Sequence, residues 1–190
     1  METEPLDDVE VIKKVLAGQQ DLYGLILDRY QKPIFNFIYR FFGNYALAED
    51  LTQDTFLRCY QFLKSYDQKR KFSTWLYTVA KNLCIDHLKK RSPGREISLE
   101  RVLPVVEKKN SSLPQDQNPQ RMCIRSQEDA RLFEGLGELE PTRRLVLVLY
   151  YFQGLTYQEI AETLSVPVST VKIRIFRAKK ALLEKMKGRL

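Results

Sequence analysis

Hydrophobic side chains in the first half of the chain recur three or four positions apart, which is the period of an α-helix. Val9, Ile12 and Leu16 share one side of the first such segment, which Gly18 ends. We expect Pro33 to mark a bend or the first turn of a further helix. The pattern as a whole predicts helices within residues 6–17, 21–30, 34–42, 48–63 and 69–91.

The second half of the chain has shorter apolar segments separated by turn residues. Residues 142–152 are nearly all apolar, but they are too few to span a bilayer, so we expect them to form the core of a small domain. Thr156 and Glu159 have the spacing of a capping box. A short helix after Thr156, a break at residues 165–167 and a second periodic segment over residues 168–182 together indicate a helix-turn-helix.

Between these halves the helical period fails. Prolines and serines are frequent in residues 93–124, a composition typical of an extended linker. Composition leaves open whether this linker is free or lies along a channel of a partner. Asn118 and Pro119 are a typical helix start, and they predict a helix to about Leu136. The sequence therefore predicts an all-α protein of two small helical domains joined by a flexible linker, with limits at 1–92, 93–124 and 125–190.

The 190-residue chain carries a net charge of +7. This charge favours an anionic partner, nucleic acid before membrane. No segment is long and apolar enough to cross a bilayer, and the acidic amino-terminal residues do not resemble a signal peptide. We therefore expect a cytoplasmic protein that is not inserted into a membrane.

Residue types that serve catalysis and metal binding are scarce. The chain has three widely spaced cysteines and a single histidine, which argues against a zinc finger, a disulfide framework and a histidine-activated nucleophile. The motifs of phosphate-binding loops, dinucleotide-binding folds and serine hydrolases are absent from the sequence. The sequence predicts neither an enzyme, nor a cofactor, nor a metal site.

Residues 69–91, KRKFSTWLYTVAKNLCIDHLKKR, combine cations and aromatic rings in one segment. Cations follow a phosphate backbone, and rings accept unstacked bases at about 1–3 kcal/mol each. We expect Ser73 or Thr74 to cap the helix. A buried face is predicted for Leu76, Val79, Ala80 and Leu83. The candidate nucleic-acid residues are Lys69, Arg70, Lys71, Phe72, Trp75, Tyr77, Lys81, Asn82, Asp86, Lys89, Lys90 and Arg91. This segment taken alone favours an ordinary helix with a solvated basic end, and nucleic-acid binding is the other interpretation.

An acidic group begins the predicted helix over residues 48–63. Leu51, Thr55, Cys59 and Leu63 have the spacing of an inward face, so Asp50 and its acidic neighbours face outward. Acids at a helix amino terminus offset the helix dipole by about 0.3–1 kcal/mol, and physical chemistry alone favours this interpretation. The alternative is a docking patch for a basic protein.

The second helix of the helix-turn-helix carries polar and basic side chains in its first turns. In that position a recognition helix meets base edges and phosphates. A helical hairpin without a DNA role is the less favoured alternative, because the capping box, the turn and the basic second helix all agree. The candidate duplex-binding residues are Thr156, Ser169, Thr170, Lys172, Arg174 and Arg177.

Taken in order, three segments of the chain resemble bacterial RNA polymerase sigma factors of the extracytoplasmic-function group. AEDLTQDTF is similar to the family's core-polymerase-binding segment. KFSTWLYTVAKNLCIDHLKKR is similar to its promoter-melting and minus-ten recognition helix. PTRRLVLVLYYFQGLTYQEIAETLSVPVSTVKIRIFRAKKAL is similar to its minus-thirty-five-binding domain.

This resemblance implies a role for each candidate site and reverses the interpretation of the acids. The clamp coiled coil of core RNA polymerase would bind the acidic segment, residues 69–77 would separate the strands, and Asn82 and Asp86 would read exposed minus-ten bases. The helix-turn-helix would bind the minus-thirty-five duplex. The resemblance also implies an anti-sigma factor as a partner. The implied polymerase-binding residues are Asp50, Leu51, Gln53, Asp54 and Phe56.

Three residues depart from the family pattern. Serine replaces the usual glycine at Ser165 and Ser169, and Ile173 replaces a small polar residue. A left-handed backbone at Ser165 would cost on the order of 1 kcal/mol. The main alternative function is a stand-alone helix-turn-helix regulator that binds duplex operators, and a weaker one is a single-strand-binding adaptor.

Overall fold

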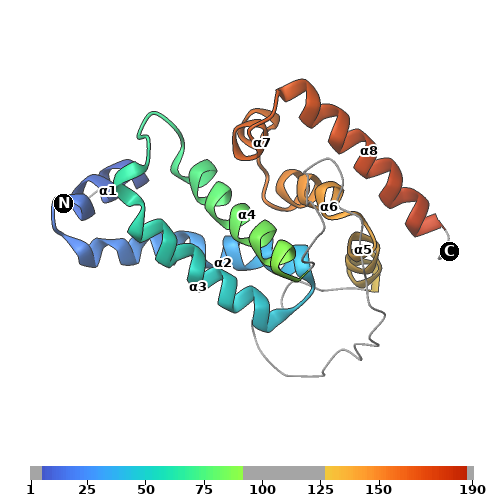
Figure 1. The fold of residues 1–190 in the computed structure, drawn as a ribbon, viewed down its shortest axis with the longest axis horizontal. Helices are drawn as coiled ribbons and strands as arrows, with labels where there is room; N and C mark the ends of the chain where they lie inside the picture. Colours follow the sequence, from blue (N-terminus) through green and yellow to red (C-terminus); the bar gives the residue numbers. More distant parts are fainter. Residues whose placement is uncertain (1–5, 92–126, 188–190) are drawn as a thin grey trace.

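The computed structural model describes residues 6–91 and 127–187, and all regular structure among these residues is helical (Figure 1). The all-α prediction is therefore confirmed, whereas the predicted linker and the helix start at Pro119 lie outside the described residues. None of the described helices combines the length and the hydropathy needed to cross a membrane. The first region contains α1 (Asp8–Leu16), η1 (Gln20–Leu22), α2 (Tyr23–Phe42), α3 (Tyr45–Gln61), η2 (Leu63–Ser65) and α4 (Phe72–Arg91). The second region contains α5 (Gln127–Gly137), α6 (Pro141–Leu147), η4 (Val148–Phe152), α7 (Tyr157–Leu164) and α8 (Val168–Lys187).

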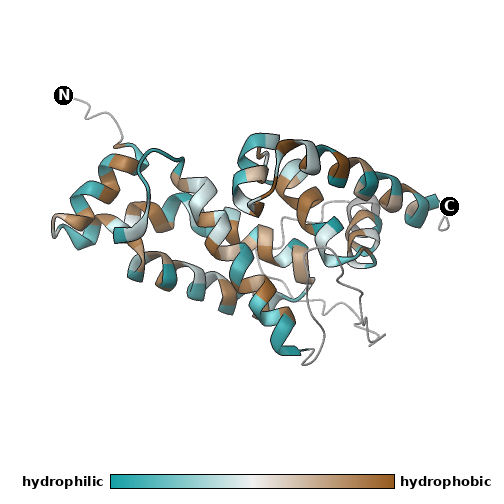
Figure 2. Ribbon diagram, turned by 45° about the horizontal axis from the view of Figure 1, so that its top comes forward, coloured by the Kyte–Doolittle hydropathy of each residue, from teal (hydrophilic) through white to brown (hydrophobic). Residues whose placement is uncertain are grey.

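The core of the first region lies where α2, α3 and α4 face one another. Phe37 of α2, Cys59 of α3 and Leu76 of α4 are fully buried there. Figure 2 shows hydrophobic and hydrophilic residues alternating along these helices, as expected for helices with one buried face. The predicted inward face is confirmed by the burial of Leu51, Thr55 and Cys59 of α3 and of Leu63 in η2.

A single continuous helix, α2, spans Pro33, so the predicted helix start at this residue is wrong. A proline inside a helix removes one hydrogen bond and costs about 3 kcal/mol. Ile26 before the proline and Ile34 and Phe37 after it are all fully buried on the same helix. Burial of this face on both sides of Pro33 outweighs the local cost.

The buried face of α1 also differs from the prediction. Val11, Ile12 and Val15 are buried, whereas Leu16 is 39% exposed. A capping box formed by Asp7 and Glu10 begins the helix. The next residue, Asp8, accepts a hydrogen bond from Arg29 Nη1 at 2.7 Å. This contact with α2 turns the side of α1 that carries Asp8 toward the bundle, and Val11, Ile12 and Val15 lie on that side.

Helix α4 begins at Phe72, so Ser73 and Thr74 lie within its first turn and the prediction that one of them caps the helix is wrong. The Phe72 ring is 2% exposed and packs edge-on against Tyr30 and Tyr66. The buried ring of Phe72 therefore anchors the start of α4 in the helical bundle. The hydroxyl of Thr74 is buried and has no hydrogen-bond partner among the described residues.

The apolar segment of the second region is α-helical only in its first part. Helix α6 ends at Leu147, and a π-helical turn over Val148–Phe152 follows. The N–H of Gln153 donates to the carbonyl oxygen of Val148, five residues earlier, at 3.1 Å. The wider turn changes which side chains face inward, so that Val148 and Leu149 are buried while Tyr151 is 54% exposed.

The predicted helix-turn-helix is confirmed as a structure. Thr156 and Glu159 form the capping box of α7, and α8 follows after the turn. Ala161 of α7 is 5% exposed, and Val171, Ile175 and Ala178 are the buried residues of α8. Ser165 ends α7 with a left-handed backbone, at φ 55° and ψ 45°.

Ser165→Gly is expected to stabilise the protein by about 1 kcal/mol, because a left-handed conformation costs an L-residue roughly 1–2 kcal/mol that glycine does not lose. Urea unfolding followed by circular dichroism measures the change. Lys179→Gly is the control, since this exposed position inside α8 is right-handed and glycine there is expected to destabilise by about 1 kcal/mol. Equal destabilisation by both changes would contradict the prediction.

The first and second regions pack against each other. Helix α4 contacts α7, and α2 contacts α5, α6 and η4. Figure 1 shows α4, in green, beside the second region, in orange and red. Some side chains of α2 and α4 therefore pack inside the first region, and others pack against the second region.

Candidate nucleic-acid and polymerase interfaces

The carboxyl-terminal half of α4 presents polar and basic side chains to solvent. Asn82 is exposed, and so are the three basic residues of the last turn, Lys89, Lys90 and Arg91. Cations at this end of a helix interact favourably with its dipole, so these three positions stabilise the helix. Asp86 is half exposed and lies 3.9 Å from Nη1 of Arg58 on α3.

The aromatic rings at the start of α4 differ in their access to solvent. Phe72 and Tyr77 are buried, at 2% and 4% exposure, whereas Trp75 is half-buried. The Trp75 ring lies 5.4 Å from Tyr66 and 5.7 Å from Phe72, measured between centroids. Of the three rings predicted to accept bases, only Trp75 presents a partly open surface in this conformation.

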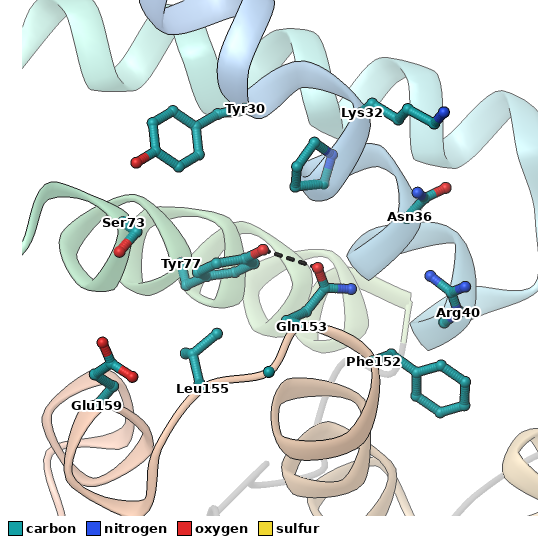
Figure 3. A pocket seen from close by; sticks show the side chains of 12 residues that line it. Tyr30, Lys32, Asn36, Arg40, Ser73, Tyr77, Phe152, Gln153, Leu155 and Glu159 are labelled. Carbon is teal, nitrogen blue, oxygen red and sulfur yellow. Dashed lines mark hydrogen bonds between the residues drawn. The ribbon is translucent and has the colours of Figure 1, made fainter. Parts of the chain in front are cut away.

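Tyr77 and Lys81 face the second region instead of solvent. The Tyr77 hydroxyl donates to Oε1 of Gln153 at 2.8 Å (Figure 3). Nζ of Lys81 donates to the carbonyl oxygen of Thr163 at 3.1 Å, and the residue is only 7% exposed. Burial raises the pKa of Tyr77 and lowers that of Lys81. The candidate nucleic-acid residue Lys81 is therefore not open to DNA in this conformation, because α7 covers it.

The acidic segment lies on the outer face of α3. Asp50, Gln53 and Asp54 are exposed, and neither carboxylate has an ion-pair partner among the described residues. Leu51 and Phe56 are buried, at 6% and 5% exposure. Side chains buried in the bundle do not reach a partner, so Leu51 and Phe56 are corrected from contact residues to residues that hold α3 in place.

Helix α8 exposes Ser169, Lys172 and Arg177 on one surface. Thr170 is half-buried, and so is Arg174, whose Nη1 is buried without a hydrogen-bond partner among the described residues. Thr156 is exposed, but its hydroxyl is engaged in the capping box with Glu159. The most accessible candidates for a duplex are therefore Ser169, Lys172 and Arg177.

Ile173 and Phe176 lie on the same helix and were missed as candidates. Phe176 is 71% exposed and Ile173 is 51% exposed. Both side chains lie on the exposed surface of the recognition helix, and an apolar contact with a thymine methyl group is a known mode of base recognition. The signal in the sequence was an apolar residue directly beside a basic one in the recognition helix, at positions that helical spacing places off the core.

Comparison with known proteins adds to this geometry. Residues 26–93 match the family described as Sigma-70 region 2, and residues 130–182 match Sigma-70, region 4. The chain is 36% identical over 177 residues to the ECF RNA polymerase sigma factor SigW of Bacillus subtilis (strain 168), across 93% of this chain and 95% of the relative. This chain belongs to the extracytoplasmic-function group of the sigma-70 family.

Two solved sigma-factor structures have a similar fold. The structure of CnrH in complex with the cytosolic domain of CnrY matches with a TM-score of 0.69 and 23% identity, over 95% of this chain and 97% of that chain. The sigma factor RpoE of Bartonella quintana, in complex with the anti-sigma factor NepR, matches with a TM-score of 0.64 and 21% identity, over 87% and 96%. The described helices are thus arranged much as in these two structures.

Arg144 of this sigma factor is a further functional candidate that sequence reasoning missed. Its guanidinium donates to the carbonyl oxygens of Gly137 and Leu139 in the second region and of Phe41 in the first. Burial lowers its pKa to about 10, so the group stays charged at neutral pH. The sequence offered no signal beyond two adjacent arginines, Arg143 and Arg144, at the start of an apolar segment.

Proposed function

We propose that this sigma factor divides promoter recognition between its two regions. In this proposal α3 binds core RNA polymerase, α4 reads the minus-ten element and α8 binds the minus-thirty-five duplex. The observation that carries it is the presence, in one chain, of an exposed basic helix end on α4 and an exposed basic helix-turn-helix on α8. The proposed domain limits are 1–92 and 125–190, and we assign the chain to the cytoplasm, where core polymerase acts.

The proposed polymerase contact uses the exposed side chains of Asp50, Gln53 and Asp54. Their partner is the basic coiled coil of the polymerase clamp. Charge complementarity of this kind steers association and fixes register. The polymerase performs the chemistry, so this chain is assigned recognition only, with no catalytic residue.

The proposed minus-ten contact lies along the open face of α4. Asn82 and Asp86 present side chains with donors and acceptors suited to base edges, while Lys89, Lys90 and Arg91 present charge to phosphates. Trp75 offers a ring on which one unstacked base stacks. Lys69 and Arg70, exposed before the helix, extend the basic path.

The proposed minus-thirty-five contact lies on α8. Ser169, Lys172 and Arg177 face the major groove and its phosphates, with Thr170 and Arg174 at the edge of this surface. Phe176 is proposed to contact a thymine methyl group, since its open ring lies beside Arg177. Specificity arises when both DNA contacts form at once, because each raises the effective concentration of the other.

An anti-sigma factor is proposed as a further partner. CnrH is bound by the cytosolic domain of CnrY, and RpoE of Bartonella quintana is bound by the anti-sigma factor NepR. The similar fold of this chain supports a partner of the same class, which would cover the DNA-binding surfaces of α4 and α8.

Transcription from a promoter library by purified core polymerase tests the proposal. We expect start sites that appear only when the chain is added and that share two sequence blocks at one spacing. Core polymerase without the chain is the control. If no start site depends on the chain while the chain alone retains duplex DNA, a stand-alone helix-turn-helix regulator replaces the sigma-factor function.

A further inference from the structure

The Trp75 ring, on which an unstacked base is proposed to stack, packs within a cluster of aromatic rings. Its centroid lies 5.4 Å from that of Tyr66 and 5.7 Å from that of Phe72. Phe72 in turn packs edge-on against Tyr30, at 5.6 Å and an interplanar angle of 65°. Figure 3 shows the Tyr30 ring extending from α2 toward the first turn of α4. Because edge-to-face contacts are directional, each ring limits the orientation of the next.

A carboxylate of α1 fixes the far end of this cluster. The Tyr30 hydroxyl donates to Oδ2 of Asp8, and Nη1 of Arg29 donates to Oδ1 at 2.7 Å. Hydrogen bonds to an ionised acceptor are stronger than neutral ones. Burial and the bond to Asp8 raise the pKa of Tyr30, so its hydroxyl stays protonated and continues to donate. Capping does not account for Asp8, because Asp7 and Glu10 form the capping box of α1.

The same cluster supports the loop that precedes α4. Tyr66 is 6% exposed, and its hydroxyl donates to the carbonyl oxygen of Arg70. Helix α1 contacts η2, and the carboxylate of Asp8 adds to burial in raising the pKa of Tyr66. The amino-terminal end of α1 therefore lies close to this tyrosine. Residues 67–71 include Lys69 and Arg70, which belong to the proposed basic path for DNA.

We infer, resting on the proposed function, that α1 takes part in minus-ten recognition without contacting DNA itself. Asp8 is a positioning residue: acting through Tyr30 and Phe72, it holds Trp75 in the orientation in which a base stacks on it. A ring that is already held in its binding orientation loses less conformational freedom when a base binds than a mobile ring does. The bond between α1 and α2 therefore lowers the free-energy cost of capturing an unstacked base.

Tyr30→Phe removes the bond to Asp8 and keeps the ring. We expect it to lower run-off transcription from the chain's own duplex promoter about tenfold, because a hydrogen bond to a charged group no longer orients the ring. Tyr23→Phe is the matched control on the same helix. The Tyr23 hydroxyl donates to the carbonyl oxygen of Phe56 at 2.9 Å, and its ring packs on Tyr60 of α3. The control should stay within about twofold, since loss of one neutral hydrogen bond leaves the chain folded.

Trp75 is the single tryptophan of the chain, so tryptophan fluorescence of the full-length protein reports on this ring alone. Tyr30→Phe and Asp8→Asn each weaken the bond between α1 and α2. We expect both to shift the emission to longer wavelength and to increase quenching by acrylamide, because a less restrained ring is more accessible to water. Tyr23→Phe should change neither property. Circular dichroism checks that every variant keeps its helical content.

A double-mutant cycle shows whether Tyr30 acts through Trp75. In a Trp75→Ala background the ring that Tyr30 positions is absent, so Tyr30→Phe should lower transcription by no more than about twofold. A residue that only stabilised the fold would cause the same loss in both backgrounds. Equal losses in the two backgrounds, or no loss in the native background, would overturn the inference.

The fluorescence separates this inference from the proposed function. If Tyr30→Phe alters the Trp75 emission and Tyr23→Phe does not, but no start site depends on the chain, the positioning contact stands and the minus-ten assignment fails. If the native chain directs transcription and Trp75→Ala impairs it, but Tyr30→Phe changes neither emission nor transcription, the function stands and the positioning role of Asp8 is wrong.

Discussion

Asp54→Lys is expected to abolish binding of this sigma factor to core RNA polymerase while leaving its helical fold intact. Asp54 is exposed on α3 and has no ion-pair partner among the described residues, so its replacement breaks no internal contact. Opposed like charges at an interface cost several kcal/mol, which corresponds to a loss of more than about a hundredfold in affinity. Biolayer interferometry with immobilised core polymerase measures the loss, and circular dichroism checks the fold.

A matched charge reversal separates docking from overall charge. Asp21 is an exposed aspartate of the first region, in η1 and outside the acidic segment of α3. Asp21→Lys changes the net charge by the same amount and is expected to leave polymerase affinity within about threefold, because exposed charges away from an interface are screened. Undiminished binding by Asp54→Lys, or equal losses in both variants, would refute the assigned docking face.

Asn82→Ala is expected to lower transcription from the chain's own promoter by roughly tenfold to a hundredfold. Asn82 is exposed near the middle of α4, so its side chain amide is free to bond a base edge, and such a contact is worth about 1–3 kcal/mol of discrimination. Loss of base reading also relaxes specificity, so minus-ten base substitutions should matter less to the variant than to the native chain. Run-off transcription on a set of minus-ten variants measures both effects.

Lys89→Ala is the control for this prediction. Lys89 is exposed in the last turn of α4, in the part assigned to phosphates. Its loss is expected to weaken binding about equally on all sequences and to reduce the salt dependence by about one charge. A uniform loss from Asn82→Ala, indistinguishable from that of Lys89→Ala, would contradict the base-reading role.

Features governed by neighbouring residues were predictable from the sequence. The capping box of Thr156 and Glu159 and the turn at Ser165 lie within a few residues of one another, so local hydrogen bonding and backbone conformation determine them. The inward face of α3 was predictable because one helix surface supplies its whole pattern. The three family-like segments extended this local information to function.

The local pattern was insufficient where two forces competed within one segment. Pro33 disfavours a helix interior, but α2 continues through it because its apolar face is buried on both sides. On α1, the contact from Asp8 to Arg29 selected a different buried face from the one that apolar spacing indicated. Single-helix periodicity does not include such contacts.

By itself, the sequence determined the helical class, the helix-turn-helix and the acidic and basic surfaces, because these depend on side-chain chemistry and short spacings. Only the tertiary structure decided which of those side chains are open. Lys81 and Tyr77 are buried by α7 and by the segment after η4, and Arg144 joins three carbonyls that lie far apart in the chain or across a turn. Exposure depends on which elements pack together, and that packing is settled by the whole apolar surface of both regions, not by any one segment.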